Sequence, residues 1–477
     1  MSSDTIHEKR PTSVTLEGDE QPSRANKVEA ADIQVVNNPS DEPPDGGYGW
    51  IIVICAFWAN AVTWGVNSAF GVYLSFYTTN NFFPGATNID FAFIGGLSVG
   101  CAMLIAPIAN YLSKRYNFKV PLTIGVIVYT LSQIFSGLST TIWQLFLTQG
   151  IMFGIGVGLI FVPISPLSNQ WFSDKRALAT GLLAGGSGAG TIIFAQTTQA
   201  VIVKLGLRWA FFINAIISFV ILVPVVILMK SRVHIIQGKF EPIQYQLLWH
   251  PGFLWVWLWG FFTILGYLIS LYTVATFATA GLGLSQSQGA AIQSILAAGQ
   301  MVGRPLAGLF MDRWGRINLA IIWTFISGLS CFVIWIVARS FSVLAFFGFV
   351  QGLSGGIFWS AGTPITTEII GLKHLGSALS ILWLSIVLPS IFAEPIAVWL
   401  LQEAQRRTGI TLPSNDSSDA TTNTNVGVSG AGTGDTSAAV VFQTPIGFAG
   451  AMFMVGTVLL YGAKRWKQGN WKIGTKT

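Results

Sequence analysis

The sequence predicts an all-α membrane protein with twelve transmembrane helices in two pseudo-symmetric six-helix halves. Composition is the first reason: 52% of the 477 residues are hydrophobic and 10% are charged, whereas a soluble domain carries about 25% charged residues. Twelve apolar runs provide the second reason, because a helix needs about 20 such residues to cross the hydrocarbon core. The third is an internal repeat, since the pattern Gln-Gly-x-x-x-Gly at 149–154 returns at 351–356.

An acidic tail over residues 1–44 precedes the first apolar run. Ten of the twenty acidic residues lie between Asp4 and Asp45, among Ser, Pro and Asn. Such a composition buries too little apolar surface to offset the entropy of folding. The tail is therefore predicted to be disordered and cytoplasmic.

The twelve apolar runs are each predicted to form one span. They cover residues 50–77, 91–112, 120–138, 142–163, 177–200, 209–230, 252–280, 287–309, 317–338, 342–362, 375–401 and 441–463. The fifth and eighth runs are the least apolar, because they are rich in Gly and polar residues. The predicted units are a half over 45–230, a cytoplasmic linker over 231–250, a half over 251–463 and a basic cytoplasmic tail over 464–477.

Lysine and arginine are distributed unequally between the two sides of the predicted bundle. The inner loops and the C-terminal tail carry sixteen of these residues, whereas the outer loops carry only Lys204, Arg208, Arg339, Arg406 and Arg407. Because basic loops stay in the cytoplasm, both termini are predicted to be cytoplasmic. The charges are scattered rather than gathered in one patch, so we expect no nucleic-acid partner. The expected location is the plasma membrane, with a vacuolar membrane as the alternative.

One long outer loop, over 402–440, is rich in Ser, Thr, Asn and Gly. It contains the sequon Asn415-Asp416-Ser417, which predicts glycosylation on an outside face. A chance sequon in a loop of this composition is the alternative.

Two charged residues stand inside predicted spans, Arg304 in the eighth and Glu394 in the eleventh. A charge at membrane depth is costly and normally faces a cavity or a partner. Gln300 and Arg304 share one helix face, and a guanidinium there can bind a carboxylate with two parallel hydrogen bonds. The alternative is that Arg304 pairs internally with Glu394 or with carbonyl groups. Glu394 is either a protonatable coupling group or an interfacial acid with no role in transport.

Polar and aromatic side chains on other spans are further candidates for the lining of a cavity. Asn60 and Asn67 lie on one stripe of the first span, and Tyr267 lies on a similar stripe of the seventh. Trp383, on the eleventh, is placed to stack on a flat substrate. Helix packing and interhelical hydrogen bonds are the alternative for each of them.

A charged motif follows the eighth span. Residues 308–316 read Gly-Leu-Phe-Met-Asp-Arg-Trp-Gly-Arg and include the candidate gating residues Asp312, Arg313 and Arg316. The corresponding stretch of the first half, 110–115, lacks the acid and the glycine. A generic charged helix stop is the alternative interpretation.

Two further motifs lie at the start of the first and fifth spans. Residues 45–50 read Asp-Gly-Gly-Tyr-Gly-Trp and include Asp45, Gly46, Gly47 and Trp50. The glycines let the chain turn tightly before the Trp side chain anchors the helix at the membrane surface. Residues 171–181 read Trp-Phe-Ser-Asp-Lys-Arg-Ala-Leu-Ala-Thr-Gly and include Arg176 and Gly181.

Together these motifs resemble the monocarboxylate porter family of the major facilitator superfamily, in its fungal branch, over residues 45–463. The resemblance implies the major facilitator fold, alternating access, and an arginine in the Arg304-Pro305 context that binds anionic substrate. An accessory single-span partner is possible in the family, but no residue here indicates one. Proton-coupled members carry a lysine where this chain has Ser68 and an aspartate where it has Gln300. The usual proton coupling is therefore in doubt, which leaves uncoupled diffusion or coupling through Glu394.

The predicted function is transport of a small monocarboxylate or related carboxylated metabolite by alternating access. Uptake of a riboflavin-type vitamin, or efflux of a secondary metabolite, is the alternative, and a non-transporting nutrient sensor is the second. No span contains a His/Asp/Glu cluster, so we expect neither an enzyme nor a cofactor or metal. The expected partners are the lipid bilayer and a small organic anion.

Overall fold

The computed structural model describes residues 44–80, 82–232, 245–372, 374–410 and 436–469. These residues all belong to one compact unit. Within the described ranges the chain forms helices and turns, without strands. The acidic tail predicted over 1–44 lies outside the described residues, apart from Pro44, as do most of the linker and of the outer loop.

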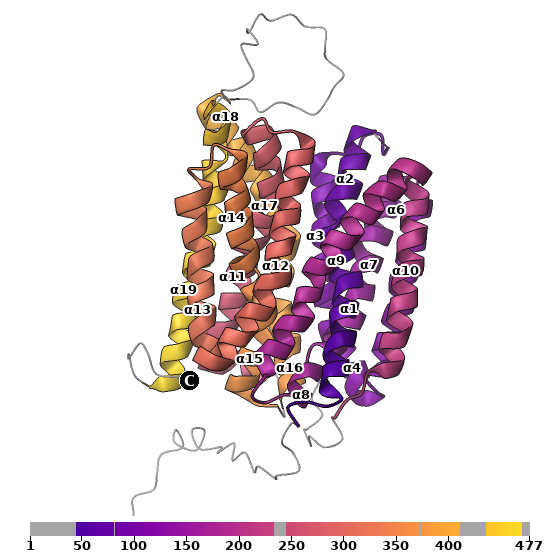
Figure 1. Cartoon of the computed structure of the whole chain (residues 1–477), viewed down its shortest axis with the longest axis vertical. Helices are drawn as coiled ribbons and strands as arrows, with labels where there is room; N and C mark the ends of the chain where they lie inside the picture. Colours follow the sequence, from indigo (N-terminus) through magenta and orange to yellow (C-terminus); the bar gives the residue numbers. More distant parts are fainter. Residues whose placement is uncertain (1–43, 81, 233–244, 373, 411–435, 470–477) are drawn as a thin grey trace, which may run out of the picture. The chain divides into compact units, whose positions relative to one another are not determined.

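Six membrane segments form the N-terminal half (Figure 1). They are α1 (Gly49–Ser68) with α2 (Phe70–Thr79); α3 (Asn88–Leu104) with α4 (Ala106–Arg115); α5 (Lys119–Leu138); α6 (Ile142–Leu145) with η2 (Phe146–Met152), α7 (Phe153–Ile164) and α8 (Leu167–Trp171); α9 (Arg176–Leu205); and α10 (Leu207–Leu228).

Six more form the C-terminal half, after the short η3 (Tyr245–Trp249). They are α11 (Pro251–Thr276) with η4 (Phe277–Gly281); α12 (Gln286–Trp314); α13 (Arg316–Ser330) with η5 (Cys331–Trp335); α14 (Phe341–Gly355) with α15 (Ile357–Ile370); α16 (Leu375–Ser385) with α17 (Val387–Thr408); and α18 (Thr436–Val441) with α19 (Gln443–Gln468). The twelve predicted spans and the two-half architecture are confirmed.

Eleven described segments are long and apolar enough to cross a membrane. The remaining one, α12, corresponds to the eighth predicted span. It is 29 residues long, which is about 43 Å at the helical rise of 1.5 Å per residue. Its length suffices, but glutamines and Arg304 dilute its apolar character. The segment that departs from the composition of a membrane helix is thus the one that carries Arg304.

Several spans break where Pro or Gly interrupts the helix. The second span turns at Ile105, just before Pro107 in the first turn of α4, where the missing N–H of proline leaves no helical hydrogen bond unmade. The tenth span breaks at Gly356, between α14 and α15. Each break redirects the second half of its span, and the break at Gly356 lies beside Arg304.

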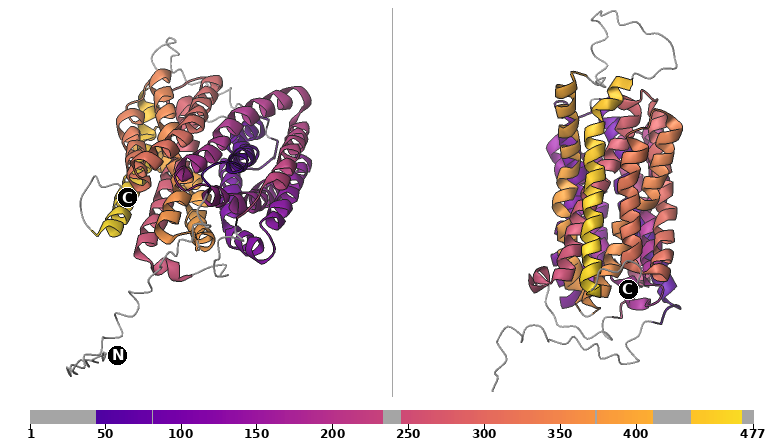
Figure 2. Two further views of the ribbon diagram at one scale, coloured as in Figure 1. Left: turned by 60° about the horizontal axis from the view of Figure 1, so that its bottom comes forward. Right: turned by 90° about the vertical axis from the view of Figure 1, so that its left-hand side faces the viewer.

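The two halves meet along two seams, α9 against α12 and α3 against α17. Figures 1 and 2 show α9 and α12 at the boundary between the two bundles. Glycines bring the backbones together, since a Cβ atom on Gly308 would lie 2.3 Å from the Ala177 carbonyl oxygen. On the second seam, a Cβ atom on Gly96 would lie 2.7 Å from the Ile391 carbonyl oxygen. Small residues permit this close approach in membrane proteins.

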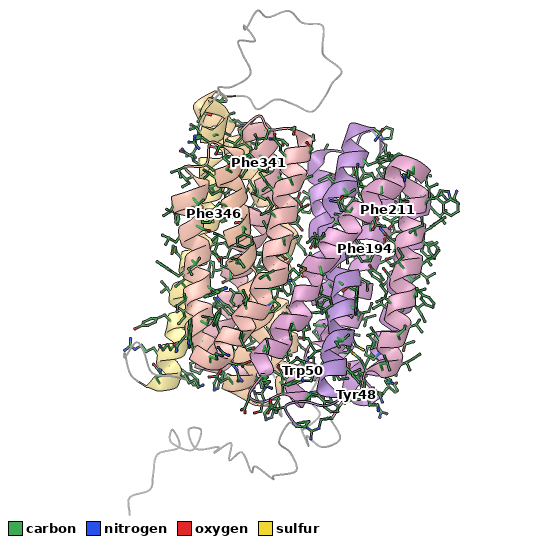
Figure 3. All side chains as sticks on the ribbon, in the orientation of Figure 1. Tyr48, Trp50, Phe194, Phe211, Phe341 and Phe346 are labelled. Carbon is green, nitrogen blue, oxygen red and sulfur yellow. The ribbon has the colours of Figure 1, made fainter. Side chains whose placement is uncertain are left out.

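The end of the bundle where α12 finishes and α9 begins is called the Asp312 end below. It is the lower end in Figure 1, with α4 and α8. Tyr48 and Trp50 lie at this end, where α1 starts (Figure 3). Phe211 lies toward the opposite end of the N-terminal half, where its ring stacks on that of Tyr73 with centroids 4.4 Å apart.

Candidate functional site

Arg304 lies on α12 at the α9–α12 seam, with 5% of its surface exposed. One terminal nitrogen donates to the Ala184 carbonyl at 2.8 Å and to the Ser187 hydroxyl, both on α9. The other terminal nitrogen donates to the Tyr267 hydroxyl on α11 at 3.4 Å. The guanidinium therefore bridges the two halves of the molecule.

The positive charge of Arg304 has no acidic partner within 4.0 Å among the described residues. The alternative of an Arg304–Glu394 ion pair is therefore not found, although the carbonyl bond to Ala184 is. Nε has no hydrogen-bond partner. It faces Gly356, where a Cβ atom would lie 3.0 Å from both Nε and the second terminal nitrogen. Gly356 has no side chain that could accept a hydrogen bond from this edge of the guanidinium, so Nε is buried without a partner.

Gln300 and Tyr267 lie beside Arg304, as the helix faces predicted. Both are 5% exposed, and the Tyr267 hydroxyl is hydrogen-bonded to both Arg304 and Gln300. Three of the predicted substrate-binding residues thus converge, and all come from the C-terminal half.

Trp383 belongs to an aromatic cluster that also contains Trp64, Phe161, Phe358 and Trp359. Its ring stacks on Trp359 with centroids 6.0 Å apart and an angle of 19° between planes. Phe161 of α7 lies 5.2 Å from the ring of Trp383, and Trp64 of α1 lies 5.2 Å from that of Trp359. The aromatic cluster therefore spans both halves.

Asn60 and Asn67, predicted on one stripe, make different contacts. The Asn60 amide donates to the Ala56 carbonyl of its own helix at 2.9 Å. Asn67 accepts a hydrogen bond from Ser98 at 2.6 Å and lines a small cavity enclosed by residues of the N-terminal half. The helix α1 ends at Ser68, so the stripe does not continue straight along the span.

Glu394 lies on the second seam, where α17 faces α3. One carboxyl oxygen, Oε2, is buried without a hydrogen-bond donor and lies 3.5 Å from the Cβ position of Gly95. Tyr272 of α11 is close enough to interact with it electrostatically. Burial of an ionised carboxylate without a donor is costly, so the closed seam favours the protonated carboxyl group.

Asp312 of α12 connects the two halves at the Asp312 end of the bundle, where it contacts the start of α9. Its carboxylate accepts the backbone N–H groups of Ala177 at 3.1 Å and Leu178 at 2.8 Å, in the first turn of α9. Arg316 donates to the Ser173 carbonyl at 2.9 Å and lies 3.5 Å from Asp312. Arg313 is exposed. Asp312 and Arg316 therefore form an inter-half latch, whereas Arg313 faces outward.

The two signature motifs meet each other in space. Asp45 accepts the backbone N–H groups of residues 173–175 at 2.8 to 3.3 Å, and the ring of Trp50 packs 4.9 Å from that of Phe172. Asp45 and Gly47 adopt positive φ angles of 48° and 60°, which gives the tight turn expected next to Gly46.

The rest of the second motif packs inward from this loop. Arg176 is buried and donates to the Phe172 carbonyl at 3.1 Å. A Cβ atom on Gly181 would lie 2.3 Å from the Arg304 carbonyl oxygen, so this glycine sets the distance between α9 and α12.

Several contacts were not predicted from the sequence. Ser187 and the Ala184 carbonyl hold Arg304, although nothing in the periodicity of α9 marks them. Glu368 pairs with Arg316 and with Lys467, which ties α15 to the latch and to α19. Two inter-half hydrogen bonds of 3.2 Å join Ser165 to Thr363 and Asn169 to Thr367. The i, i+4 spacing shared by these two pairs is a signal that was present in the sequence.

Other predictions concern residues for which the structure offers no test. Asn415 lies outside the described residues. Ser68, which stands where coupled relatives carry lysine, is half-buried at the end of α1. The described residues contain no group of three or more potential metal ligands.

Known proteins resemble this chain in sequence and in fold. The family profile described as Major Facilitator Superfamily matches residues 49–316 and 269–413. The chain is 32% identical over 377 residues to "Probable transporter MCH2" of Saccharomyces cerevisiae, across 77% of this chain and 79% of that protein. It is 27% identical over 397 residues to "Monocarboxylate transporter 12" of Xenopus laevis, across 75% and 84% of the two chains.

Among solved structures, the proton:xylose symporter XylE bound to 6-bromo-6-deoxy-D-glucose matches with a TM-score of 0.62 at 14% identity. The match covers 88% of this chain and 95% of that chain, and it shows the shared fold. The chain belongs to the Major Facilitator Superfamily, in a fungal branch that resembles the monocarboxylate porters, and it is a secondary membrane transporter rather than an enzyme.

Proposed function

We propose that this transporter moves a small monocarboxylate or a related carboxylated metabolite by alternating access. One observation carries the proposal: Arg304 is buried between the two halves with no acidic partner in reach among the described residues. An unpaired buried charge is strongly destabilising, and a substrate carboxylate would supply the missing counter-charge.

The geometry around Arg304 supports binding of a carboxylate rather than of a cation or sugar. One nitrogen is held by α9, which fixes the plane of the guanidinium. The opposite edge, made by Nε and the second terminal nitrogen, faces Gly356. Two parallel N–H groups match the two oxygens of a carboxylate. Gln300 and Tyr267 add neutral groups that can donate to the same substrate.

The same contacts explain how substrate binding would act on the transport cycle. Arg304 sits on the C-terminal half and holds α9 of the N-terminal half, so a ligand on its free edge lies at the boundary between the moving parts. Substrate sites at the midplane between repeats are the general plan of such carriers. The latch of Asp312 and Arg316 would open when the halves rock toward the other state.

The proposed orientation places the Asp312 end in the cytoplasm, because Lys and Arg are concentrated in the loops at that end. The plasma membrane is the proposed location, with a vacuolar membrane as the alternative. Asn415, in the outer loop, would then be available for glycosylation.

Proton coupling of the usual family type is not expected, because Ser68 and Gln300 replace the titratable groups. Transport is then either uncoupled or coupled through Glu394, whose carboxyl oxygen is buried without a donor. Vitamin uptake or secondary-metabolite efflux remains the alternative activity, and a sensor would bind the same ligand without moving it.

The decisive experiment measures uptake of labelled acetate, lactate, pyruvate and benzoate into proteoliposomes. We expect Arg304→Ala to lower kcat/KM by at least about 30-fold, which corresponds to ~2 kcal/mol for a buried charge that loses its partner. Arg304→Lys should restore part of the activity, because lysine keeps the charge but not the paired N–H groups.

Arg313→Ala is the matched control, since it removes an exposed arginine two turns farther along the same segment. If Arg304→Ala takes up substrate as fast as the wild type, the arginine is structural, and the support for an anionic substrate is lost. Ligand binding without any uptake would favour the sensor.

A further inference from the structure

We infer that the substrate is a planar aromatic carboxylate, with its carboxylate on Arg304 and its ring in the aromatic cluster. This inference rests on the proposed function and names the substrate class. Three observations carry it: the position of the aromatic cluster between the halves, the unpaired N–H groups of the cluster and of Arg304, and the short chain segments that connect the cluster to the contacts of Arg304.

The aromatic cluster lies where the two halves must separate during transport. Trp64 and Phe161 come from the N-terminal half, whereas Phe358, Trp359 and Trp383 come from the C-terminal half. Centroid distances across the boundary are 5.2 Å for Trp64–Trp359, 5.2 Å for Phe161–Trp383 and 6.2 Å for Phe161–Trp359. In this closed arrangement the rings cover one another. When the halves rock apart, these faces lose their partners together, and a flat ring between them would restore the contacts.

The aromatic cluster also contains N–H donors that have no hydrogen-bond partner within the protein. The indole nitrogens of Trp64 and Trp383 are buried without a hydrogen-bond acceptor. The exposed fraction of the residue is 0% for Trp383 and 9% for Trp64, so water does not replace the missing acceptor. Unpaired indole groups occur at Trp323 and Trp335 as well, so such a group alone does not make a site. Here two of them accompany the unpaired Nε of Arg304. All three are donors, and donors call for a ligand that offers acceptors.

Arg304 and the aromatic cluster approach each other through the same helices. Gly356, at the free edge of the guanidinium, stands three residues before Trp359, which is about one helical turn or 5 Å. On the other side Ser187, which accepts from Arg304, is one turn from Gly190. A Cβ atom on Gly65 would lie 2.5 Å from Gly190, and Trp64 is the neighbouring residue. We therefore expect a ligand in which the carboxylate and the ring are joined directly or by a short linker.

A short aliphatic acid does not use these features. Acetate or lactate would satisfy Arg304 but would leave the separated ring faces and the indole donors exposed. A hydroxylated benzoate would meet all three, because its hydroxyl oxygen can accept a hydrogen bond from an indole N–H. Discrimination between the two classes should therefore arise from the aromatic cluster, and the anion requirement from Arg304.

The experiment is competition against labelled benzoate uptake in proteoliposomes of the full chain. Unlabelled phenylacetate, indole-3-acetate, cyclohexanecarboxylate, lactate and acetate are compared at matched pH. We expect half-inhibition by the aromatic acids at concentrations at least tenfold lower than by lactate and acetate. Cyclohexanecarboxylate has the size of benzoate without its flat ring, and it should compete several-fold less well than benzoate.

Two variants separate the contribution of the rings from that of the charge. Trp359→Leu should raise the half-inhibition concentration of the aromatic acids about tenfold and leave that of lactate unchanged. Trp383→Phe keeps a ring but removes one N–H donor, so it should weaken 4-hydroxybenzoate more than benzoate. Trp335→Phe is the control, because it removes a buried unpaired indole outside the aromatic cluster.

The outcomes distinguish the two levels of the argument. If lactate and the aromatic acids compete equally well, the aromatic inference is overturned but carboxylate transport is not. This comparison requires only the wild-type protein. If cyclohexanecarboxylate and benzoate compete equally well, the pocket recognises apolar size rather than a flat ring. That result also overturns the aromatic inference. Aromatic uptake that survives Arg304→Ala overturns the proposed function itself.

Discussion

The two seams between the halves occupy equivalent places in the duplicated fold but are built differently. At the Asp312 end of the first, a carboxylate accepts two backbone N–H groups in the first turn of α9. At the equivalent place beside the second seam, Asn110 of α4 packs on Gly376 in the first turn of α16, with its oxygen 2.8 Å from the Cβ position. A charge-assisted bond to a helix N-terminus is the stronger interaction. Duplication preserved the geometry, while only one copy kept the charge.

The charges buried along the two seams differ in the same sense. The first seam holds Arg304, bonded to α9 from the opposite half. The second holds Glu394, whose buried oxygen has no donor. One seam is therefore fastened by polar contacts, and the other closes on apolar packing around a single carboxyl group. We therefore expect substitutions on the first seam to change thermal stability and substrate uptake. Substitutions on the second seam should change the dependence of transport on pH.

The largest effect is expected from filling the contact between α9 and α12. Gly308→Ala would place a Cβ atom 2.3 Å from a backbone carbonyl that cannot move aside, and overpacking of this kind costs about 3 kcal/mol. Gly95→Ala is the control at a roomier position on the other seam, where the nearest atoms are 3.4 and 3.5 Å away, unlike the neighbouring Gly96, which contacts a backbone carbonyl as Gly308 does. We expect it to be neutral or slightly stabilising, because alanine favours a helix by up to about 1 kcal/mol.

Thermal unfolding in detergent measures both variants. A large decrease of Tm for Gly308→Ala with no decrease for Gly95→Ala would show that the backbone contact at Gly308 leaves no room for a side chain. Equal losses would mean that the distance from the Cβ position to its nearest neighbour does not decide which glycine tolerates a side chain.

The next effect concerns the pH response of the second seam. Closure favours the neutral form of Glu394, so lowering the pH should favour the closed seam and raising it the open one. Glu394→Gln mimics the neutral form permanently. If an inward proton gradient drives accumulation in the wild type, we expect Glu394→Gln to equilibrate substrate without accumulating it.

Uptake in proteoliposomes with and without the gradient distinguishes the cases. Accumulation that survives in Glu394→Gln would contradict coupling at this residue. A wild type that ignores the gradient identifies an uncoupled carrier, in which Glu394 is an interfacial acid. Glu403→Gln is the control, since Glu403 lies on the same helix and pairs with Arg407 outside the seam.

The sequence predicted most of the fold but only part of the site. Span number followed from apolar run length, and the shared face of Gln300 and Arg304 followed from helical periodicity, because both are local properties. The partners of Arg304 on α9 were not predictable in this way, since Ala184 and Ser187 lie more than one hundred residues away in the chain. Periodicity states which face a residue occupies but not which helix covers that face.

Asn67 shows the same limit from within one span. Asn60 and Asn67 lie on one stripe of α1, as predicted, but the hydrogen bond that Asn67 accepts from Ser98 of α3 could not be read from that stripe. The contact of Asp45 with residues 173–175 could not be predicted either, because the two motifs are visible in the sequence but their proximity in space is not. Each of these contacts depends on the packing between segments, which a single sequence does not encode locally.

The latch at the Asp312 end should give an intermediate effect. Asp312→Asn keeps one acceptor for the α9 N–H groups but removes the charge and the 3.5 Å ion pair with Arg316. Loss of a charged helix cap costs about 1–2 kcal/mol, so the open population of this end should rise about five- to thirtyfold. Asn110→Asp should act in the opposite direction, by giving α16 the carboxylate that its first turn lacks.

Spin labels at the exposed Lys175 and Arg313, one on each half, report this opening as a distance distribution. The three free cysteines, Cys55, Cys101 and Cys331, are replaced first. An unchanged distribution in Asp312→Asn would show that the charge on α9 does not hold this end closed.

The smallest effect is expected at the contact between α4 and α16, the counterpart of the latch in the duplicated fold. Lys114 donates to the Ser377 hydroxyl at 3.3 Å, and both side chains lie where α4 meets α16. A single long hydrogen bond contributes about 1 kcal/mol at most, so Ser377→Ala, at a buried serine, should lower Tm by no more than about 2 °C and leave the label distances unchanged. If Ser377→Ala instead opened the protein as much as Asp312→Asn, hydrogen bonding rather than charge would hold both ends.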